Sequence, residues 1–325
     1  MKSNLDPHIT AYLAKELVKE QFPHWSHLEI KPVKFMGHDN RAFRLGSEML
    51  VRMPSAARYA TKVEKEQKWL PFLSKHLSLA IPKPIAMGSK SENYPFNWSI
   101  YEWIDGESAN SITLSDQELE QLALDLANFL NELHRIDTKG APVPGEHNFF
   151  RGANLSVYDL ETKQAIKKLG HLIDAVKATS LWERAVSTKW EFVPVWIHGD
   201  IATGNILIKD GRLSAVIDFS AVAIGDPACD LVIAFTLFSG KSRQIFIDNL
   251  KLDENTWERA RGWALWKALI TLAKIDDIKS EEADTQKKLI AQLAEHKKGR
   301  QRKIGLLQGK IKISAEFDDG LPDII

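Results

Sequence analysis

The chain has little cysteine, no excess charge of either sign and no long hydrophobic run. Cys229 is the single cysteine among 325 residues, which excludes an intramolecular disulfide framework. The balance of 43 basic against 43 acidic residues argues against a large nonspecific nucleic-acid surface. No hydrophobic stretch is long enough to cross a bilayer, and the first residues lack the apolar core of a signal peptide. We therefore expect a cytoplasmic protein without nucleic-acid or membrane partners.

The most informative stretch is VWIHGDIATGNILI at residues 195–208, followed by VIDFS from Val216. It places Asp200, Asn205 and Asp218 between hydrophobic segments that favour strands. Phosphoryl transfer needs a carboxylate that orients the acceptor hydroxyl and hard oxygen ligands that hold Mg²⁺. Each of these residues alone would be interpreted as a solvated loop residue. Together they predict a phosphotransferase.

A predicted hairpin explains how Asp218 returns to Asn205. The segments 206–209 and 212–218 are apolar and favour strands, and Asp210-Gly211 between them is typical of a tight turn with positive φ. The hairpin would bring Asp218 beside the loop that holds Asn205.

Two further features of this region are expected to be structural. His198 precedes Asp200 by two residues, and we expect it to tie loop backbone together rather than to transfer protons. Downstream, Asp226 and Asp230 in GDPACD lie near the start of an apolar run from Leu231, where carboxylates favour a helix N-terminus. Helix capping is expected for at least one of them.

The motifs HGD followed by Asn, then IDF, then GDPACD resemble those of the aminoglycoside phosphotransferase family, over residues 33–274. The resemblance implies an α+β, bilobal, protein-kinase-like fold with a small antiparallel-sheet lobe and a mainly helical lobe. It also implies ATP or GTP as phosphoryl donor with Mg²⁺, and a small-molecule hydroxyl as acceptor. In this resemblance Asp200 is the catalytic base, and Asn205 and Asp218 are the magnesium ligands.

The N-terminal half resembles the family less closely. Gly37 would let the backbone approach the nucleotide phosphates, although an ordinary hairpin turn is the alternative for a single glycine. Arg52 lies in the short strand MLVRMP, where kinase-like enzymes usually have the lysine that contacts the α- and β-phosphates. This is a departure, because arginine has a planar fork of donors and a different reach. The resemblance implies that Arg52 binds phosphate and contributes to catalysis.

A glutamate on the next helix is expected to pair with Arg52. Hydrophobic periodicity predicts that helix over about residues 56–73, with Glu66 on its buried face and Glu64 toward solvent. A solvated surface position is the alternative for Glu66. The segment WSIYEWIDG from Trp98 resembles the fifth strand and hinge, where backbone groups of Glu102 and Ile104 would contact the purine.

Three parts of the chain are predicted: a nucleotide-binding lobe with hinge at residues 1–106, a catalytic and acceptor-binding lobe at 107–296, and an extended tail at 297–325. Ser115 and Glu118 form a capping box for an amphipathic helix that ends near Arg135. Residues 136–194 are interpreted as a helical insertion.

Several polar and aromatic residues could face the acceptor, but a plainer interpretation is preferred for each group. A solvated loop is preferred for Arg151, Asn154 and Asp159. Core packing is preferred for Trp257, Trp263 and Trp266. A solvated helix face is preferred for the acidic group Asp276, Asp277, Glu281, Glu282 and Asp284.

The tail does not resemble a kinase. Its alternating residues from Ile304 weakly resemble the C-terminal arm of Phd/YefM-type antitoxins, which implies a protein partner; packing on the large lobe or a dimer contact are the alternatives. The acceptor could be an aminoglycoside, a macrolide, an amino alcohol or a sugar. A nucleotide-binding pseudokinase and a regulatory protein that binds its partner through the tail are the competing functions.

Overall fold

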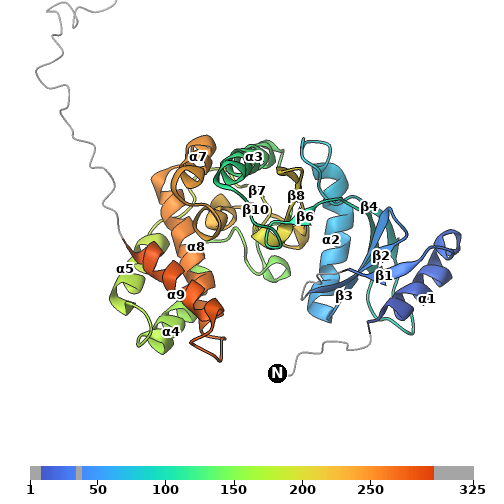
Figure 1. Ribbon diagram of the computed structural model, residues 1–325, viewed down its shortest axis with the longest axis horizontal. Helices are drawn as coiled ribbons and strands as arrows, with labels where there is room; N and C mark the ends of the chain where they lie inside the picture. The colour runs from blue at the N-terminus through green and yellow to red at the C-terminus, as the bar shows by residue number, and fades with distance from the viewer. Residues whose placement is uncertain (1–8, 34–38, 296–325) are drawn as a thin grey trace, which may run out of the picture. The chain divides into compact units, whose positions relative to one another are not determined.

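The computed structural model describes residues 9–33 and 39–295, and the chain through Ala294 forms one compact unit. Gly37 and the predicted tail, including its antitoxin-like arm, lie outside the described residues. Within the unit, an N-terminal sheet with two helices precedes a larger helical region, as Figure 1 shows. This arrangement confirms the predicted α+β fold with a small sheet lobe and a mainly helical lobe.

The small lobe is built on an antiparallel sheet of five strands in the order β1-β2-β3-β5-β4. Side chains alternate across a strand, and in β3 this alternation puts Val51 and Met53 in the hydrophobic core that also contains α1. Arg52 therefore points to the opposite face, toward the catalytic region. The small-lobe elements are α1 (Ala11–Gln21), η1 (Pro23–Trp25), β1 (Ile30–Pro32), β2 (Asn40–Leu45), β3 (Met49–Pro54), α2 (Ala57–Leu73), β4 (Pro84–Gly88) and β5 (Trp98–Glu102).

Helix α2 has the buried face predicted from its periodicity. Val63, Glu66, Leu70 and Leu73 are buried, whereas Glu64 is exposed and accepts a hydrogen bond from the Asn97 side chain at 3.0 Å. The predicted orientation of the helix is confirmed.

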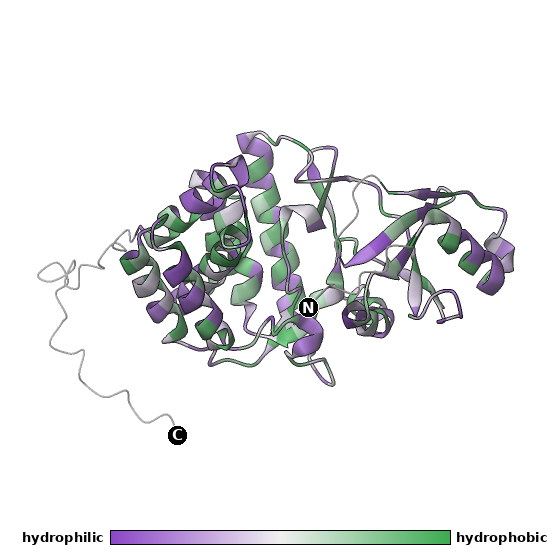
Figure 2. Cartoon of the chain, turned by 90° about the horizontal axis from the view of Figure 1, so that it is seen from below, coloured by the Kyte–Doolittle hydropathy of each residue, from purple (hydrophilic) through white to green (hydrophobic). Residues whose placement is uncertain are grey.

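The large lobe contains the main hydrophobic core; helices such as α3 and α5 are amphipathic, whereas α8 is buried on most sides (Figure 2). The predicted capping box begins α3: the Ser115 amide donates to Glu118 at 2.8 Å, and the Glu118 amide donates to the Ser115 hydroxyl at 3.3 Å. The helices and turns of this lobe are α3 (Asp116–Arg135), η2 (Glu146–Asn148), η3 (Leu155–Tyr158), α4 (Asp159–Leu169), α5 (Ala175–Val186), η4 (Thr203–Asn205), η5 (Phe219–Ala221), η6 (Pro227–Val232), α6 (Ile233–Thr236), α7 (Gly240–Leu250), α8 (Glu254–Leu272) and α9 (Glu281–Ala294).

Two small groups of strands flank the segments that contain Asp200, Asn205 and Asp218. β6 pairs with β8 and β8 with β9, while β7 pairs with β10, all antiparallel. Asp210 and Gly211 join β8 and β9 with φ values of 52° and 72°, so the predicted hairpin is confirmed. Among the described residues, no helix is long and apolar enough to span a membrane. The strands are β6 (Glu107–Ser108), β7 (Val195–Ile197), β8 (Ile206–Lys209), β9 (Arg212–Val216) and β10 (Ala223–Gly225).

Candidate active site

The catalytic loop begins where β7 ends at Ile197. Gly199 has φ of +86°, and a Cβ at this position would lie 2.7 Å from the carbonyl oxygen of Ala221. A side chain at residue 199 would therefore both strain the backbone and collide with η5. Glycine between His198 and Asp200 lets the chain turn so that Asp200 reaches the cavity.

His198 and Asp230 fix this turn from the buried side. Nε2 of His198 lies 3.0 Å from the Ile217 carbonyl oxygen, and Nδ1 accepts a hydrogen bond from the Asp200 amide at 3.2 Å. The Nε2 tautomer satisfies both contacts, since one ring nitrogen must donate and the other accept. The fully buried His198 therefore ties loop backbone together, as predicted.

Asp230 binds the backbone at His198 and Gly199, a role that its position near a helix start did not predict. It is fully buried, and its two carboxylate oxygens accept hydrogen bonds from the His198 and Gly199 amides, each at 2.7 Å. Burial raises the pKa of Asp230 to about 6, although His198 and the two amide donors oppose this effect. Asp226 does cap η6 through the Ala228 amide, and it also forms a buried ion pair with Arg259 at 2.6 Å.

Asp200 lines the cavity and contacts the ammonium group of Lys267. Lys267 on α8 donates to its Oδ1 at 3.0 Å. Burial raises the pKa of the Asp200 carboxyl, but attraction by Lys267 and Arg151 outweighs burial and leaves the pKa below its usual value. The carboxylate is therefore ionised at neutral pH and can accept a hydroxyl proton.

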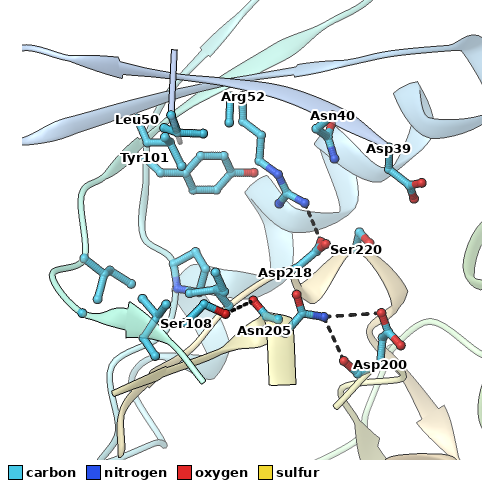
Figure 3. A pocket seen from close by; sticks show the side chains of 18 of the residues that line it. Asp39, Asn40, Leu50, Arg52, Tyr101, Ser108, Asp200, Asn205, Asp218 and Ser220 are labelled. Carbon is cyan, nitrogen blue, oxygen red and sulfur yellow. Dashed lines mark hydrogen bonds and ion pairs between the residues drawn. The ribbon is translucent and has the colours of Figure 1, made fainter. Parts of the chain in front are cut away.

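Asn205 and Asp218 lie next to this carboxylate (Figure 3). Nδ2 of Asn205 donates to the Asp200 carbonyl oxygen at 2.9 Å, which directs the amide oxygen toward Asp218. The Ile217 amide donates to the Asn205 carbonyl at 2.9 Å, so the hairpin returns to the loop as predicted. Asp218 has φ of +66°, in the left-handed region that few non-glycine residues adopt.

This donor set fits magnesium. One carboxylate and one amide oxygen are hard ligands, and Mg²⁺ is usually held by one or two carboxylates, substrate phosphates and water. In the described part of the chain, no group of three or more His, Cys, Asp or Glu side chains forms a complete protein-only metal site. Asn205 and Asp218 are thus suited to a metal that arrives with a nucleotide.

Arg52 connects the small lobe to Asp218. One terminal nitrogen of Arg52 lies 3.0 and 3.2 Å from the two carboxylate oxygens of Glu66, and the other lies 2.5 Å from Asp218. Tyr101 donates to Glu66 at 2.6 Å. Burial raises the pKa of Asp218, but Arg52 overcomes this effect and lowers the pKa to about 2. The predicted pairing of Arg52 with Glu66 is present, and the guanidinium also reaches a second carboxylate.

A cavity of about 860 Å³ contains these groups and extends to the hinge. Ala42 and Leu50 from the sheet and Leu207 and Ile217 from the large lobe supply apolar walls. Ile104 also lines the cavity, and its amide has no hydrogen-bond partner among the described residues. The Glu102 amide is bonded to the Lys83 carbonyl at 2.9 Å, so only its carbonyl group can take part in base recognition.

Three residues of the site were missed or placed in solvent by sequence reasoning. No sequence signal pointed to Lys267, which pairs with Asp200, or to Lys62, which lines the cavity and pairs with Asp39 at 2.8 Å. Arg151 was expected in solvent, but it lines the cavity. The expectation of a solvated loop was wrong for Arg151, because its guanidinium lies over the rings of Trp263 and Trp266. These two tryptophans are buried, as expected for core residues.

Comparison with known proteins agrees with this geometry. A family model described as the phosphotransferase enzyme family matches residues 29–263. The uncharacterized protein YcbJ of Bacillus subtilis (strain 168) is 23% identical over an alignment of 218 residues that covers 60% of this chain and 65% of that protein. The chain thus matches less than two thirds of the length of this curated relative.

Solved structures share the fold at low sequence identity. A variant of aminoglycoside 2'-phosphotransferase-IIIa in its GDP complex is 20% identical with a TM-score of 0.69, covering 87% of this chain and 97% of that one. A macrolide 2'-phosphotransferase type I is 19% identical with a TM-score of 0.59, covering 90% and 99%. These likenesses establish the protein-kinase-like fold. With the family match over most of its length, the chain belongs to the phosphotransferase enzyme family.

Proposed function

We propose that the protein transfers the γ-phosphoryl group of ATP or GTP to a hydroxyl group of a small molecule. The observation that carries this proposal is the convergence of Asp200, Asn205, Asp218 and Arg52 on one cavity, from two lobes and three segments of the chain. A solvated-loop interpretation does not explain why these groups meet.

Asp200 acts as the base in this proposal. Its carboxylate would accept a hydrogen bond from the acceptor hydroxyl and take the proton as the oxygen forms a bond to the γ-phosphorus. The bond from the γ-phosphorus to the β,γ-bridging oxygen breaks, and the nucleoside diphosphate leaves. No covalent enzyme intermediate is required.

The other groups position the donor. Asn205 and Asp218 would hold Mg²⁺, which offsets the negative charge of the phosphates. One terminal nitrogen of Arg52 would contact the phosphates, while the other stays bound to Glu66. The purine would lie between the apolar walls, with the Ile104 amide and the Glu102 carbonyl contacting its edge. The predicted roles of Gly37 and of the tail stay predictions, since both lie outside the described residues.

Relatives of the same fold support a nucleotide donor and a small acceptor. Their structures include a GDP and kanamycin complex and a streptomycin and ATP complex of aminoglycoside phosphotransferases. The intact set of Asp200, Asn205 and Asp218 favours an enzyme over a pseudokinase.

Two substitutions test the assignment. Asp200→Ala should abolish phosphoryl transfer but leave Mg²⁺-dependent nucleotide binding nearly intact, whereas Asp218→Ala should weaken that binding as well. Calorimetric titration with nucleotide, and nucleotide consumption across a panel of hydroxyl compounds, measure the two effects. Asp248→Ala, at an exposed carboxylate on α7, is the control. Equal turnover by wild type and Asp200→Ala would contradict the base assignment.

A further inference from the structure

The acceptor side of Asp200 carries positive charge from the large lobe. Lys267 approaches Asp200 from α8; it does not line the cavity, but both side chains are 42% exposed, so a ligand bound at Asp200 can reach it. Arg151 reaches the same cavity from the loop before η3. Two cations therefore border the place where the acceptor hydroxyl must bind.

Arg151 differs from Arg52 and Arg259 in its partners. Arg52 and Arg259 form ion pairs with carboxylates at 2.5–3.0 Å. Among the described residues, the Arg151 side chain has no ion pair or hydrogen bond within these distances. Its guanidinium is held by the indole faces of Trp266 and Trp263, with centroid distances of 4.7 and 5.2 Å. Contact with the faces of aromatic rings uses none of the N–H donors of a guanidinium and leaves them available to a ligand.

The acidic group at the α8–α9 connection does not offset this charge. Asp276, Asp277 and Glu282 line a separate depression that also contains Lys274, and none of the acidic group lines the cavity with Asp200 in the described chain. All five acidic residues of the group are exposed, but only Glu281, Glu282 and Asp284 lie on a helix, α9, as predicted; Asp276 and Asp277 lie in the connection before it. A polycation at Asp200 would therefore face Lys267 and Arg151, and no carboxylate of this group lines the cavity beside them.

We propose that the acceptor is a hydroxyl compound that carries an anionic group, a carboxylate or a phosphate, bound by Arg151 and Lys267. This inference rests on the proposed phosphotransferase function. The planar donor edge of Arg151 matches a carboxylate or phosphate in a two-point contact. Lys267 supplies a second, more mobile charge, and the acceptor hydroxyl replaces Lys267 as the partner of Asp200 Oδ1.

A charge-sorted acceptor panel tests this inference. The panel contains hydroxy acids, sugar phosphates, neutral polyols of matched size, and aminoglycosides including kanamycin, assayed by acceptor-dependent nucleotide consumption. We expect turnover with a carboxylate or a phosphate compound, and the two arms identify which anion is used. A preference for aminoglycosides or neutral polyols, or no turnover with any anionic compound, would overturn the inference.

Variants separate acceptor binding from action on the transferred phosphoryl group. Arg151→Gln and Lys267→Gln should each lower kcat/KM for the anionic acceptor by about tenfold or more, with a much smaller loss for its neutral analogue. Arg151→Lys should recover part of the loss. Lys241→Gln removes an exposed cation on α7 that pairs with Glu120, and it should change neither value. Equal losses for charged and neutral acceptors would show that the cations act on the phosphoryl group, which contradicts the inference.

The inference and the proposed function can fail separately. Turnover confined to neutral or cationic acceptors overturns only the inference. Absence of both Mg²⁺-dependent nucleotide binding and turnover with every class would overturn the proposed function together with it.

Discussion

The substitution Arg52→Lys tests whether the unusual arginine bridges the two lobes. In the structure, its two terminal nitrogens serve different carboxylates, Glu66 and Asp218, and its side chain is only 14% exposed. Lysine keeps the charge but has one nitrogen at the end of a flexible chain, so we expect it to keep one ion pair and weaken the other. A lost hydrogen bond to a charged group costs about 1.5–3 kcal/mol. The free energy of unfolding should fall by about that amount.

Urea denaturation and thermal melting measure this loss. For a chain of this size, the midpoint temperature should fall by about 2–4 °C. Arg212→Lys is the matched control, because Arg212 binds Asp125 with two nitrogens at 2.9 and 3.0 Å but is 60% exposed on the surface. Surface ion pairs contribute little, so this control should barely change the midpoint. Equal shifts in the two variants would refute the bridging role of Arg52.

Three further predictions concern buried or paired groups. Asp230→Ala leaves the His198 and Gly199 amides without acceptors. We therefore expect a loss of about 2 kcal/mol in the free energy of unfolding, measured by denaturation, and a large drop in kcat. Wild-type stability and wild-type kcat in this variant would contradict the role of Asp230. Burial lowers the pKa of His134 to about 4, so its contribution to stability is present above pH 6.5 and is lost as the pH falls toward 4. Lowering the pH from 7 to 5 should therefore reduce the melting temperature of the wild type more than that of His134→Leu. Parallel plots of melting temperature against pH for the two proteins would refute this. Lys267→Met removes an attraction that lowers the pKa of Asp200, so the acidic limb of kcat/KM should move to higher pH, and an unmoved limb would argue against their coupling.

Local sequence patterns predicted the parts of the site that depend on short-range structure. Asp210-Gly211 specified the turn, and the turn placed Asp218 beside Asn205 because a hairpin returns the chain to its start. Helical periodicity placed Glu66 on the buried face of α2, whereas its pairing with Arg52 was expected from the family resemblance. The roles given to these residues came from the family resemblance, and the geometry supports them without testing them.

Contacts between distant segments could not be predicted in the same way. Lys267 follows Asp200 by 67 residues, and whether its side chain reaches the loop depends on how α8 packs. The periodicity of α8 gives little help, since the helix is buried on most sides. Capping was expected for at least one of Asp226 and Asp230, and Asp226 fulfils it, but the place of Asp230 in η6 directs its carboxylate to the loop at His198 and Gly199 instead.

The charges of the cleft favour an acceptor that brings negative charge. Arg52 and Lys62 are each neutralised by protein carboxylates, and Asp200 is neutralised by Lys267. Arg151 attracts Asp200 but makes no direct ion pair among the described residues, and its guanidinium lies over aromatic faces, where desolvating a cation is costly. When the acceptor displaces Lys267 from Asp200, a second cation loses its partner. An anionic acceptor would satisfy both cations at once, whereas a neutral or cationic one would leave them unpaired, so the cleft should discriminate by charge before it discriminates by shape.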